Sequence, residues 1–356
     1  MKKTILIFLF LPLFTWMRAQ EGKTYRVRSI AFYNVENLFD IHNDSLTFDD
    51  DRTLSGKDQW TLKRYRRKLF NISKVLSEIG KKETRSAPDI IGLCEVENKQ
   101  VLNDLVNHPN LREKGYGIVH FDSPDERGID VALLYRKSVF LPTTFSSHRL
   151  LLTKEEEFRD YTRDQLVVGG LLDGEEINCI VNHWPSRSGG EQRSRPNRIA
   201  AAKLNKHIID SILRNDPGAK IISMGDLNDG PMDYSLKKIL KIKGAKEPLQ
   251  PTDLYNPMEA LHKKGYGSLA YRDKWNLFDQ LFFTANFIIG PASELKFWKA
   301  GIFKAPYLVD QKGRYKGYPY RTYANGNYVG GYSDHFPVYI LLIKEQPRAK
   351  QVFSWQ

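Results

Sequence analysis

Cysteine is scarce in this chain, since only Cys94 and Cys179 occur among its 356 residues. Two cysteines cannot build a disulfide scaffold or a thiolate zinc finger. Both lie inside apolar runs, which favours buried free thiols. Long apolar runs are also nearly absent, and repeats, low-complexity linkers and a clear domain boundary are lacking. The composition, with 41% hydrophobic and 27% charged residues, predicts a soluble globular chain with a sizeable core.

Several catalytic motifs are missing as well. The chain has no Gly-x-Ser-x-Gly elbow and no His-Glu-x-x-His helix, which argues against those hydrolase and zinc-protease classes. Gly22-Lys23-Thr24 lacks the upstream glycine of a phosphate-binding loop.

The one long apolar run lies at the N-terminus. It follows Lys2 and Lys3, extends from Thr4 to Trp16, and precedes the small residue Ala19. A bilayer span takes about 20 residues, so this shorter run predicts a signal peptide over residues 1–19, with an uncleaved anchor as the alternative. A secreted or periplasmic domain is then expected over residues 20–345, followed by a basic C-terminal tail over residues 346–356.

The chain is strongly basic. Lys and Arg number 54 against 42 Asp and Glu, for a formal net charge of +12. Such a balance suits an anionic partner, which could be nucleic acid, phospholipid or a phosphorylated metabolite.

Strands and helices alternate irregularly along the body of the chain. Apolar and β-branched runs predict strands over eight segments: Arg26 to Tyr33, Asp89 to Cys94, Asp130 to Tyr135, Gln165 to Leu172, Ile177 to Asn182, Lys220 to Met224, Phe278 to Thr284 and Phe336 to Ile343. Helical spacing predicts a helix from Leu62 that stops at Gly80. A second helix is expected to begin near Pro196, with Ile199, Leu204, Ile208 and Ile212 on its apolar side. This mixture favours a mixed α/β architecture.

Polar residues with catalytic chemistry fall where these strands begin or end. They are Asn34, Glu36, Glu95, His183, Asp226, Asn228, Asp279, Asp334 and His335. Any one of them is compatible with a solvated or capping role. Together, gathered at one rim of a sheet, they would place carboxylates, amides and imidazoles around one cleft.

The segments that carry these residues resemble the ordered signature of the endonuclease/exonuclease/phosphatase superfamily. They are Asn34-Val35-Glu36, Leu93-Cys94-Glu95, Asn182-His183-Trp184, Gly225-Asp226-Leu227-Asn228 and Ser333-Asp334-His335. The chain looks like a secreted bacterial member, similar to deoxyribonuclease I-like nucleases. The resemblance implies a four-layer α/β/β/α sandwich of two packed mixed β-sheets with outer helices. It also implies Mg²⁺-dependent cleavage of a phosphate ester, with Mn²⁺ or Ca²⁺ as other candidate ions.

The resemblance also implies individual roles. Glu95 would be the first metal ligand, with Asn34, Glu36 and Asp334 nearby. The family usually has Asp two residues after the Asn, so Glu36 is a departure. Asp279 would orient His335 for activation of an in-line water, and His183 would contact the scissile phosphate. Asp226 and Asn228 would position the same water, and whether Asp226 or His335 is the general base stays open.

Supporting residues are expected around this centre. Asp130 is a candidate partner for His183, with a plain strand-start carboxylate as the alternative. The resemblance to secreted deoxyribonucleases implies that Arg163 contacts the phosphate. Arg127 and Arg187 are further candidate phosphate contacts, because arginine forms charge-assisted hydrogen bonds with phosphate. A solvated basic loop is the alternative for Arg187.

The segment from Lys296 to Tyr332 is rich in basic and aromatic residues. Two interpretations are open: an insertion that packs its tyrosines on the sandwich, or a surface that stacks unpaired bases. Either way it leads into Asp334 and should border the cleft.

The sequence therefore predicts a metal-dependent phosphoric ester hydrolase that acts as a monomer, with a DNA- or RNA-cleaving phosphodiesterase first. A phosphomonoesterase or a sphingomyelinase-like hydrolase on phosphorylated metabolites or lipids is the alternative. A non-catalytic nucleic-acid-binding module is a third hypothesis.

Overall fold

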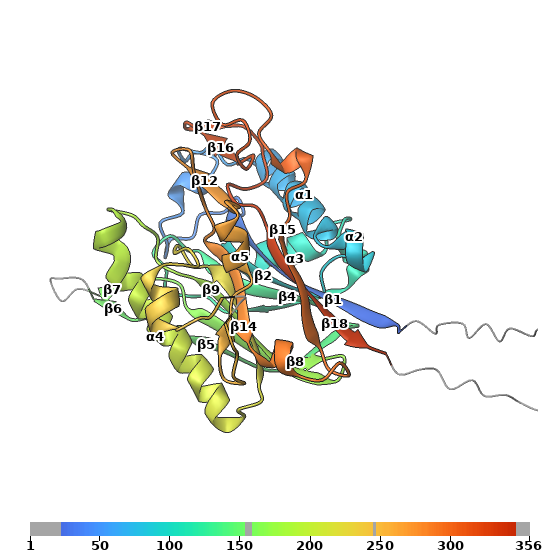
Figure 1. The fold of residues 1–356 in the computed structure, drawn as a ribbon. Coiled ribbons are helices and arrows are strands. Elements are labelled where there is room, and N and C mark those ends of the chain that lie inside the picture. Colours follow the sequence, from blue (N-terminus) through green and yellow to red (C-terminus); the bar gives the residue numbers. More distant parts are fainter. Residues whose placement is uncertain (1–22, 154–158, 245–246, 347–356) are drawn as a thin grey trace, which may run out of the picture.

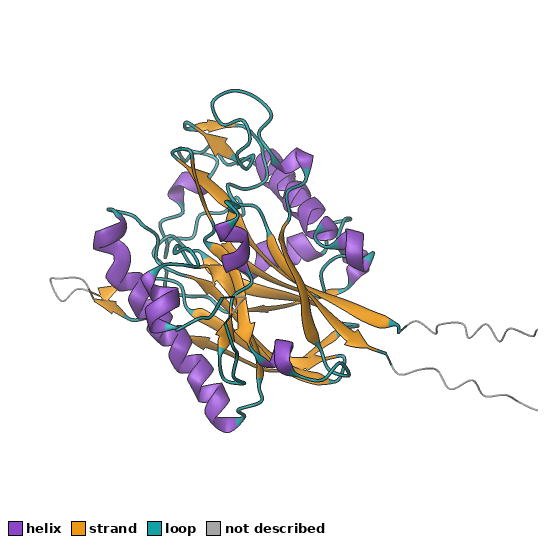
Figure 2. Ribbon diagram, in the orientation of Figure 1, coloured by secondary structure: helices purple, strands orange, loops and turns teal. Residues whose placement is uncertain are grey.

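Two central β-sheets with helices outside them make up the fold (Figures 1 and 2). The structure is a computed structural model that describes residues 23–153, 159–244 and 247–346. The predicted signal peptide, and the predicted tail beyond Gln346, lie outside the described residues. The sandwich expected from the sequence is confirmed, because two six-stranded mixed sheets pack face to face between helices. No helix in the described part of the chain is both long and apolar enough to cross a membrane.

The first sheet contains the first and the last strand of the described chain. Its strands, in spatial order, are β15 (Lys296–Ile302), β18 (Val338–Glu345), β1 (Tyr25–Leu38), β2 (Ile90–Val96), β4 (Asp130–Arg136) and β3 (Tyr116–His120). Only β1 and β2 pair in parallel, and the other neighbours are antiparallel. Three helices lie on this side of the sandwich, namely α1 (Leu62–Glu78), α2 (Lys81–Thr84) and α3 (Lys99–Val106).

The second sheet has the same size. Its order is β11 (Leu254–Tyr255), β14 (Asp279–Thr284), β10 (Lys220–Asp226), β9 (Glu175–His183), β8 (Gln165–Leu172) and β5 (Phe140–His148). The long helix α4 (Glu191–Asn215) covers its outer face. The shorter helices α5 (Met258–Lys263) and α6 (Asn286–Ile289) contribute Met258 and Phe287 to the apolar cluster between the sheets.

Small elements complete the described chain. The two-stranded pairs are β6 (Leu152–Thr153) with β7 (Arg159–Asp160), β12 (Leu269–Tyr271) with β13 (Lys274–Asn276), and β16 (Tyr323–Ala324) with β17 (Asn327–Tyr328). Single 3₁₀ turns span Asp50–Arg52, Arg112–Lys114 and Pro306–Leu308, and a π-helical turn spans Ser235–Ile239.

Three apolar clusters fill the three spaces between the four layers. Successive side chains of a strand point to opposite faces, so Ile30 and Phe32 of β1 lie between the sheets while Ala31 and Tyr33 face α1 and α3. The third cluster joins the second sheet to α4. The sheets approach closely at Gly92, where a Cβ atom would lie 2.7 Å from Met224 Sδ.

Helix α1 agrees with its sequence prediction. Thr61 caps it, since its Oγ1 accepts from the backbone N–H of Arg64 at 3.3 Å. Gly80 follows with φ +68°, a left-handed conformation that suits glycine at a helix end.

Helix α4 differs from its prediction in where it starts and in how polar its buried side is. It begins at Glu191 and not near Pro196, which lies inside the helix. Of the four predicted apolar-face residues, Ile208 is buried in the cluster beneath the helix, and Leu204 and Ile212 pack against that cluster while partly exposed. The buried face carries the polar residues Arg198 and Asn205, because Asp229 and Asn182 provide hydrogen-bond partners for them beneath the helix.

The segment from Lys296 to Tyr332 packs on the sandwich. Its first part, β15, joins the first sheet, and Tyr307 and Tyr332 contact each other with ring centroids 5.1 Å apart. Tyr307 also donates to Glu78 of α1 at 2.7 Å. The packing interpretation of the tyrosines is therefore supported for these rings.

Candidate active site

Three strands of the second sheet place polar residues in one row. Asp226 at the end of β10 lies opposite His183 of β9, which is parallel, and opposite Asp279 of β14, which is antiparallel. Neighbouring strands lie about 4.8 Å apart. Residues more than 40 positions apart in the sequence are therefore brought side by side.

The first sheet completes the cluster through Asn34 of β1. Its Nδ2 donates to Glu95 Oε1 at 3.2 Å and to Asp226 Oδ2 at 3.1 Å, while its Oδ1 accepts from the backbone N–H of Glu36 at 3.0 Å. Asn34 is only 1% exposed. In this orientation the amide links the carboxylates of the two sheets. For Asn34 to bind a metal ion directly, its amide group would have to rotate so that Oδ1 faces the ion.

Several strand-end residues of the site have a left-handed backbone. Glu36, Glu95 and Asn228 have φ values of 53°, 61° and 50°. Such φ values are uncommon for non-glycine residues and gather at functional sites. Hydrogen bonds hold the conformations here: Glu95 Oε2 accepts from the Asn37 N–H at 3.1 Å, and Asp226 Oδ1 accepts from the Asn228 N–H at 3.0 Å.

His335 and Asp279 form a buried pair. His335 Nδ1 lies 2.6 Å from Asp279 Oδ2, which is the contact that the sequence predicted. Burial by itself lowers the pKa of His335, but the carboxylate of Asp279 outweighs it, and that pKa is raised well above its ordinary value. Ser333 steadies the approach to β18, since its hydroxyl donates to the Asn34 carbonyl at 2.7 Å.

His183 faces the same centre, and its buried Nδ1 has no hydrogen-bond partner among the residues that the structure describes. Its Nε2 lies 3.8 Å from Glu95 Oε1 and 3.9 Å from Asp226 Oδ2, and His335 Nε2 is also 3.9 Å from Asp226 Oδ2. These distances exceed a hydrogen bond but allow an intervening oxygen atom. Burial, followed by the charges of Arg163 and Arg127, holds the pKa of His183 well below its usual range.

The donor set fits a divalent cation. Asp226 is buried beside Asp279 and Glu95, and its pKa is raised to about 7 by burial and by those carboxylates, although His335 partly offsets the effect. The pKa of the Glu36 carboxyl is likewise raised to about 7, because the group is buried and lies near Asp334. Crowded oxygen ligands with little neutralising charge suit a hard cation such as Mg²⁺.

One group of described residues already has metal-binding spacing. One ligand atom each from Asp226, Asp279 and His335 lies within 4.8 Å of the others, and all three residues are buried. Because Asp279 and His335 share a hydrogen bond, we expect the oxygens of Glu95 and Asp226 to be the more available ligands for the ion.

The remaining predicted residues of the centre lie at its margin. Asn228 donates from Nδ2 to the Trp184 carbonyl at 3.0 Å. Asp334 lies 3.4 Å from Arg321 Nη2 and 3.9 Å from His335 Nε2, with a side chain that is 31% exposed. Glu36 accepts from the Thr322 N–H at 2.6 Å, which turns its carboxylate toward the segment before β18.

Asp130 has a different partner from the expected one. Its Oδ2 lies 2.9 Å from His120 Nε2, and its Oδ1 accepts from the Ser123 N–H at 2.8 Å. The pairing with His183 is therefore corrected: β3 and β4 are neighbouring strands, so His120 is the imidazole within reach.

The predicted phosphate-contacting arginines are largely engaged by the protein. Buried Arg163 donates to Asp125 Oδ2 at 2.9 Å and to the Trp184 carbonyl at 2.8 Å. Arg187 donates to the Asn228 carbonyl, Asp229 and Asp233. Arg127 is half exposed, with its Nε 3.5 Å from Asp125 Oδ1.

Lys68 is a site residue that the sequence analysis did not identify. This α1 lysine is only 1% exposed and donates to Thr322 Oγ1 at 2.6 Å and to the Tyr332 carbonyl at 2.7 Å. Its Nζ lies 3.6 Å from Glu36 Oε2. The signal was present, because Lys68 follows Tyr65 at helical spacing on the apolar face of α1.

Known proteins share this architecture. The model of the Endonuclease/Exonuclease/phosphatase family matches residues 29–344. No curated protein matches the chain.

Solved structures with this fold include a humanized TDP2 from Danio rerio, at 14% identity and a TM-score of 0.52, with 89% of this chain and 99% of that chain covered. An endonuclease/exonuclease/phosphatase family protein from Bacteroides thetaiotaomicron has 15% identity and a TM-score of 0.52, covering 92% and 100%. The human Nocturnin catalytic domain with a bound sulfate anion has 15% identity and a TM-score of 0.51, covering 91% and 97%.

Proposed function

Because the chain belongs to the endonuclease/exonuclease/phosphatase family and is a phosphoric ester hydrolase of that type, we propose that it works with water and a bound divalent metal ion. The observation that carries this proposal is the space between His183 Nε2, His335 Nε2 and Asp226 Oδ2. Each imidazole nitrogen lies 3.9 Å from the carboxylate oxygen. A phosphate oxygen or a water molecule fits between groups at that separation.

A divalent ion, with Mg²⁺ first and Mn²⁺ or Ca²⁺ as alternatives, would neutralise charge on the phosphate and stabilise the developing negative charge. Glu95 and Asp226 would hold it, with Glu36 and Asp334 on the side toward the Thr322 segment. Asn34 orients the first two carboxylates through its amide group.

The two histidines have different roles in this proposal. Asp279 fixes the ring of His335, so that His335 Nε2 faces the reacting centre, and the buried carboxylate supports a charged imidazole. His183 donates a hydrogen bond to a phosphate oxygen. The proton of the attacking water goes to Asp226, or to His335 when its imidazole is neutral, since both face the same space. Asn228 fixes the Asp226 carboxylate through its N–H.

For the substrate we place a small phosphate monoester first. Nucleic-acid binding depends on free cationic side chains along the backbone, whereas Arg163 and Arg187 each contact aspartates of the protein. A nuclease, the first prediction from the sequence, is the second candidate and is favoured by the formal charge of +12.

The test is a substrate panel with purified protein and Mg²⁺, Mn²⁺ or Ca²⁺ in turn. It contains an aryl phosphate, sugar monophosphates, single- and double-stranded DNA, RNA and sphingomyelin. We expect chelator-sensitive release of phosphate from monoesters that is lost in His335→Ala. Absence of hydrolysis for every ester with every metal would refute the proposal.

We also propose export and a monomeric state. The basis for export is the N-terminal sequence alone, and fractionation of cells that make the full-length chain would test it. Sedimentation of the purified protein would test the monomer.

A further inference from the structure

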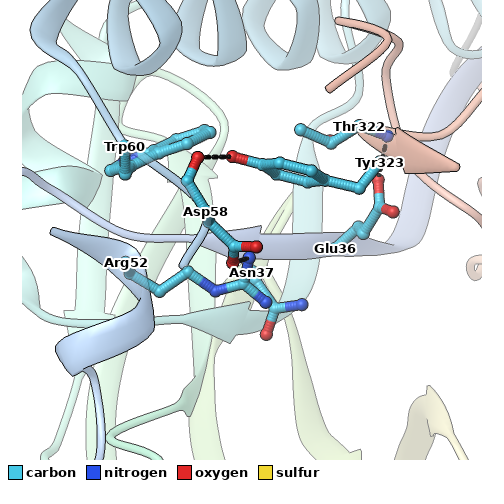
Figure 3. Close-up of a pocket in the computed structure, with 7 residues that line it drawn as sticks. All are labelled: Glu36, Asn37, Arg52, Asp58, Trp60, Thr322 and Tyr323. Carbon is cyan, nitrogen blue, oxygen red and sulfur yellow. Dashed lines mark hydrogen bonds and ion pairs between the residues drawn. The ribbon is translucent and has the colours of Figure 1, made fainter. Parts of the chain in front are cut away.

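A polar cavity lies beside the proposed active site. It has a volume of about 130 Å³ and is lined by Glu36, Asn37, Arg52, Asp58, Trp60, Thr322 and Tyr323. Figure 3 shows the rings of Trp60 and Tyr323 above the space, with the carboxylate of Asp58, Arg52 and Asn37 below it. A cavity of about 150 Å³ accommodates a six-membered ring such as benzene. This cavity is therefore large enough for one ring of similar size.

The cavity and the catalytic cluster share one stretch of β1. Asn34 contacts Asp226 and Glu95, and two residues later Glu36 lines the cavity, so their Cα atoms are at most about 7 Å apart. Asn37 serves both places, because its backbone N–H donates to Glu95 Oε2 while its side chain lines the cavity. A group in the cavity would therefore lie next to a phosphate held at the cluster.

The electrostatics of the cavity exclude a second phosphate. Its only guanidinium, among the lining residues, is that of Arg52, which forms an ion pair with Asp58. Glu36 adds a further carboxylate to the wall. Among the described lining residues an anionic group would face two carboxylates and no unpaired cation, and Lys68 beside Glu36 already donates to Thr322 and Tyr332. The cavity therefore suits a neutral occupant.

The lining polar groups favour hydroxyls. The carboxylates of Glu36 and Asp58 accept hydrogen bonds, the Asn37 amide donates and accepts, and Arg52 donates. Trp60 and Tyr323 offer apolar faces. Their ring centroids are 6.3 Å apart with planes tilted by 39°, which is not the parallel slot that would enclose a nucleobase.

We propose that this cavity binds the neutral, hydroxyl-rich ring of a sugar or cyclitol monophosphate while its phosphate lies at the catalytic cluster. The proposal rests on the proposed function and adds the substrate class. It makes Asn37 and Asp58 specificity-determining residues, which act on the ring and not on the reacting phosphorus.

Asn37→Gly is the most informative variant. Glycine accepts the left-handed φ of 57° and keeps the N–H that holds Glu95, so that only the amide side chain is lost. Asn325→Gly is the matched control, since Asn325 has φ 51° and lies in the β16–β17 turn without lining the cavity. Tyr323→Phe, paired with Tyr315→Phe as its control, removes the hydroxyl that donates to the Asp58 carbonyl.

The assay compares phosphate release from glucose 6-phosphate, mannose 6-phosphate and myo-inositol 1-phosphate with release from phenyl phosphate. We expect at least one hydroxyl-rich ester to have a lower KM than phenyl phosphate. Asn37→Gly should raise that KM by roughly tenfold, the effect of about one lost hydrogen bond in a pocket. It should lower the ratio of kcat/KM for the sugar ester to kcat/KM for phenyl phosphate by the same factor, whereas Asn325→Gly should leave that ratio unchanged.

The outcomes separate the two proposals. Hydrolysis of phenyl phosphate or nucleic acid without any preference for a hydroxyl-rich ester would overturn the cavity assignment and leave the hydrolase intact. An equal loss of kcat/KM on both esters in Asn37→Gly would also overturn the cavity assignment, because Asn37 would then act only by supporting Glu95. Failure on every ester would refute the proposed function itself.

Discussion

Nδ1 of His335 lies 2.6 Å from Oδ2 of Asp279, although the two residues are 56 positions apart in the chain. The contact joins the loop before β18 to the first residue of β14, so it connects the two sheets at the centre of the site. Substitution of either side chain should therefore reveal how much the charged imidazole contributes to turnover.

His335→Ala should lower kcat by at least about 10²- to 10⁴-fold, the usual contribution of a positioned proton-transfer group. Asp279→Asn should lower kcat less and change KM little, because the amide keeps the shape but not the charge that supports the imidazole. Steady-state kinetics on phenyl phosphate checks both, with exposed His207→Ala as the control. A His335→Ala protein within a few-fold of wild type would rule out this role.

Glu95→Gln should change the metal requirement first. Loss of a carboxylate ligand weakens a site for a hard cation, so we expect the Mg²⁺ concentration for half-maximal activity to rise at least about tenfold. Titration calorimetry with Mg²⁺ alone gives an independent reading. Glu113→Gln is the control, since Glu113 is exposed. An unchanged metal titration would exclude Glu95 as a ligand.

Lys68→Met should destabilise the fold by about 3–5 kcal/mol, because it removes one partner of a buried ion pair and leaves Glu36 without its nearest cation. The double variant Lys68→Met/Glu36→Gln should recover part of that loss. Urea unfolding measures the free energies, and exposed Lys63→Met is the control. Strictly additive effects of the two substitutions would show that the residues are not coupled.

Asp173 provides a test of pH-dependent stability away from the site. Burial raises the pKa of its carboxyl, but hydrogen bonds from Arg28 and Arg26 outweigh burial and lower that pKa. A depressed folded-state pKa gives stability that is present above the unfolded value of about 3.9 and is lost as pH falls through the folded value.

Asp173→Asn should therefore cost about 1–2 kcal/mol at pH 7 and progressively less below pH of about 4. Asparagine tolerates the φ of 51° at this hairpin turn, so the backbone is kept. Asp273→Asn is the control, because Asp273 has φ 63° and accepts instead from the uncharged Tyr318 hydroxyl. Urea unfolding at pH 7 and pH 3 measures the loss of unfolding free energy in Asp173→Asn. An equal loss at both pH values would contradict the ion-pair explanation.

The sequence predicted the central strands well because apolar alternation and strand-end polar residues are local signals. Gln165 to Leu172 agrees with β8 at both ends, and the other predicted strands overlap β1, β2, β4, β9, β10, β14 and β18. The residues of the catalytic cluster could be grouped for the same reason, since each lies near the end of a predicted strand, although β1 continues past Asn34 and Glu36 to Leu38.

Features that depend on partners from other elements could not be predicted. Arg198 and Asn205 are buried beneath α4 through contacts with Asp229 and Asn182, so hydrophobic periodicity alone missed the polar residues on the buried side of the helix. The partner of Asp130 depended on which strand lies beside β4. Lys68 required knowledge that the segment before β18 folds over α1 and presents Thr322 to it.

The pairing of β1 with β18 has a practical consequence. Tyr25 lies opposite Glu345, and the Gln346 N–H donates to the Thr24 carbonyl at 2.9 Å, so both ends of the described fold leave the sandwich together, as Figure 1 shows. The site residues lie at the other ends of the same strands, near Asn34 and before Val338. Either end could thus tether the enzyme to a surface with its cleft unobstructed, and a short linker from Gln346 to Thr24 would give a circular permutant.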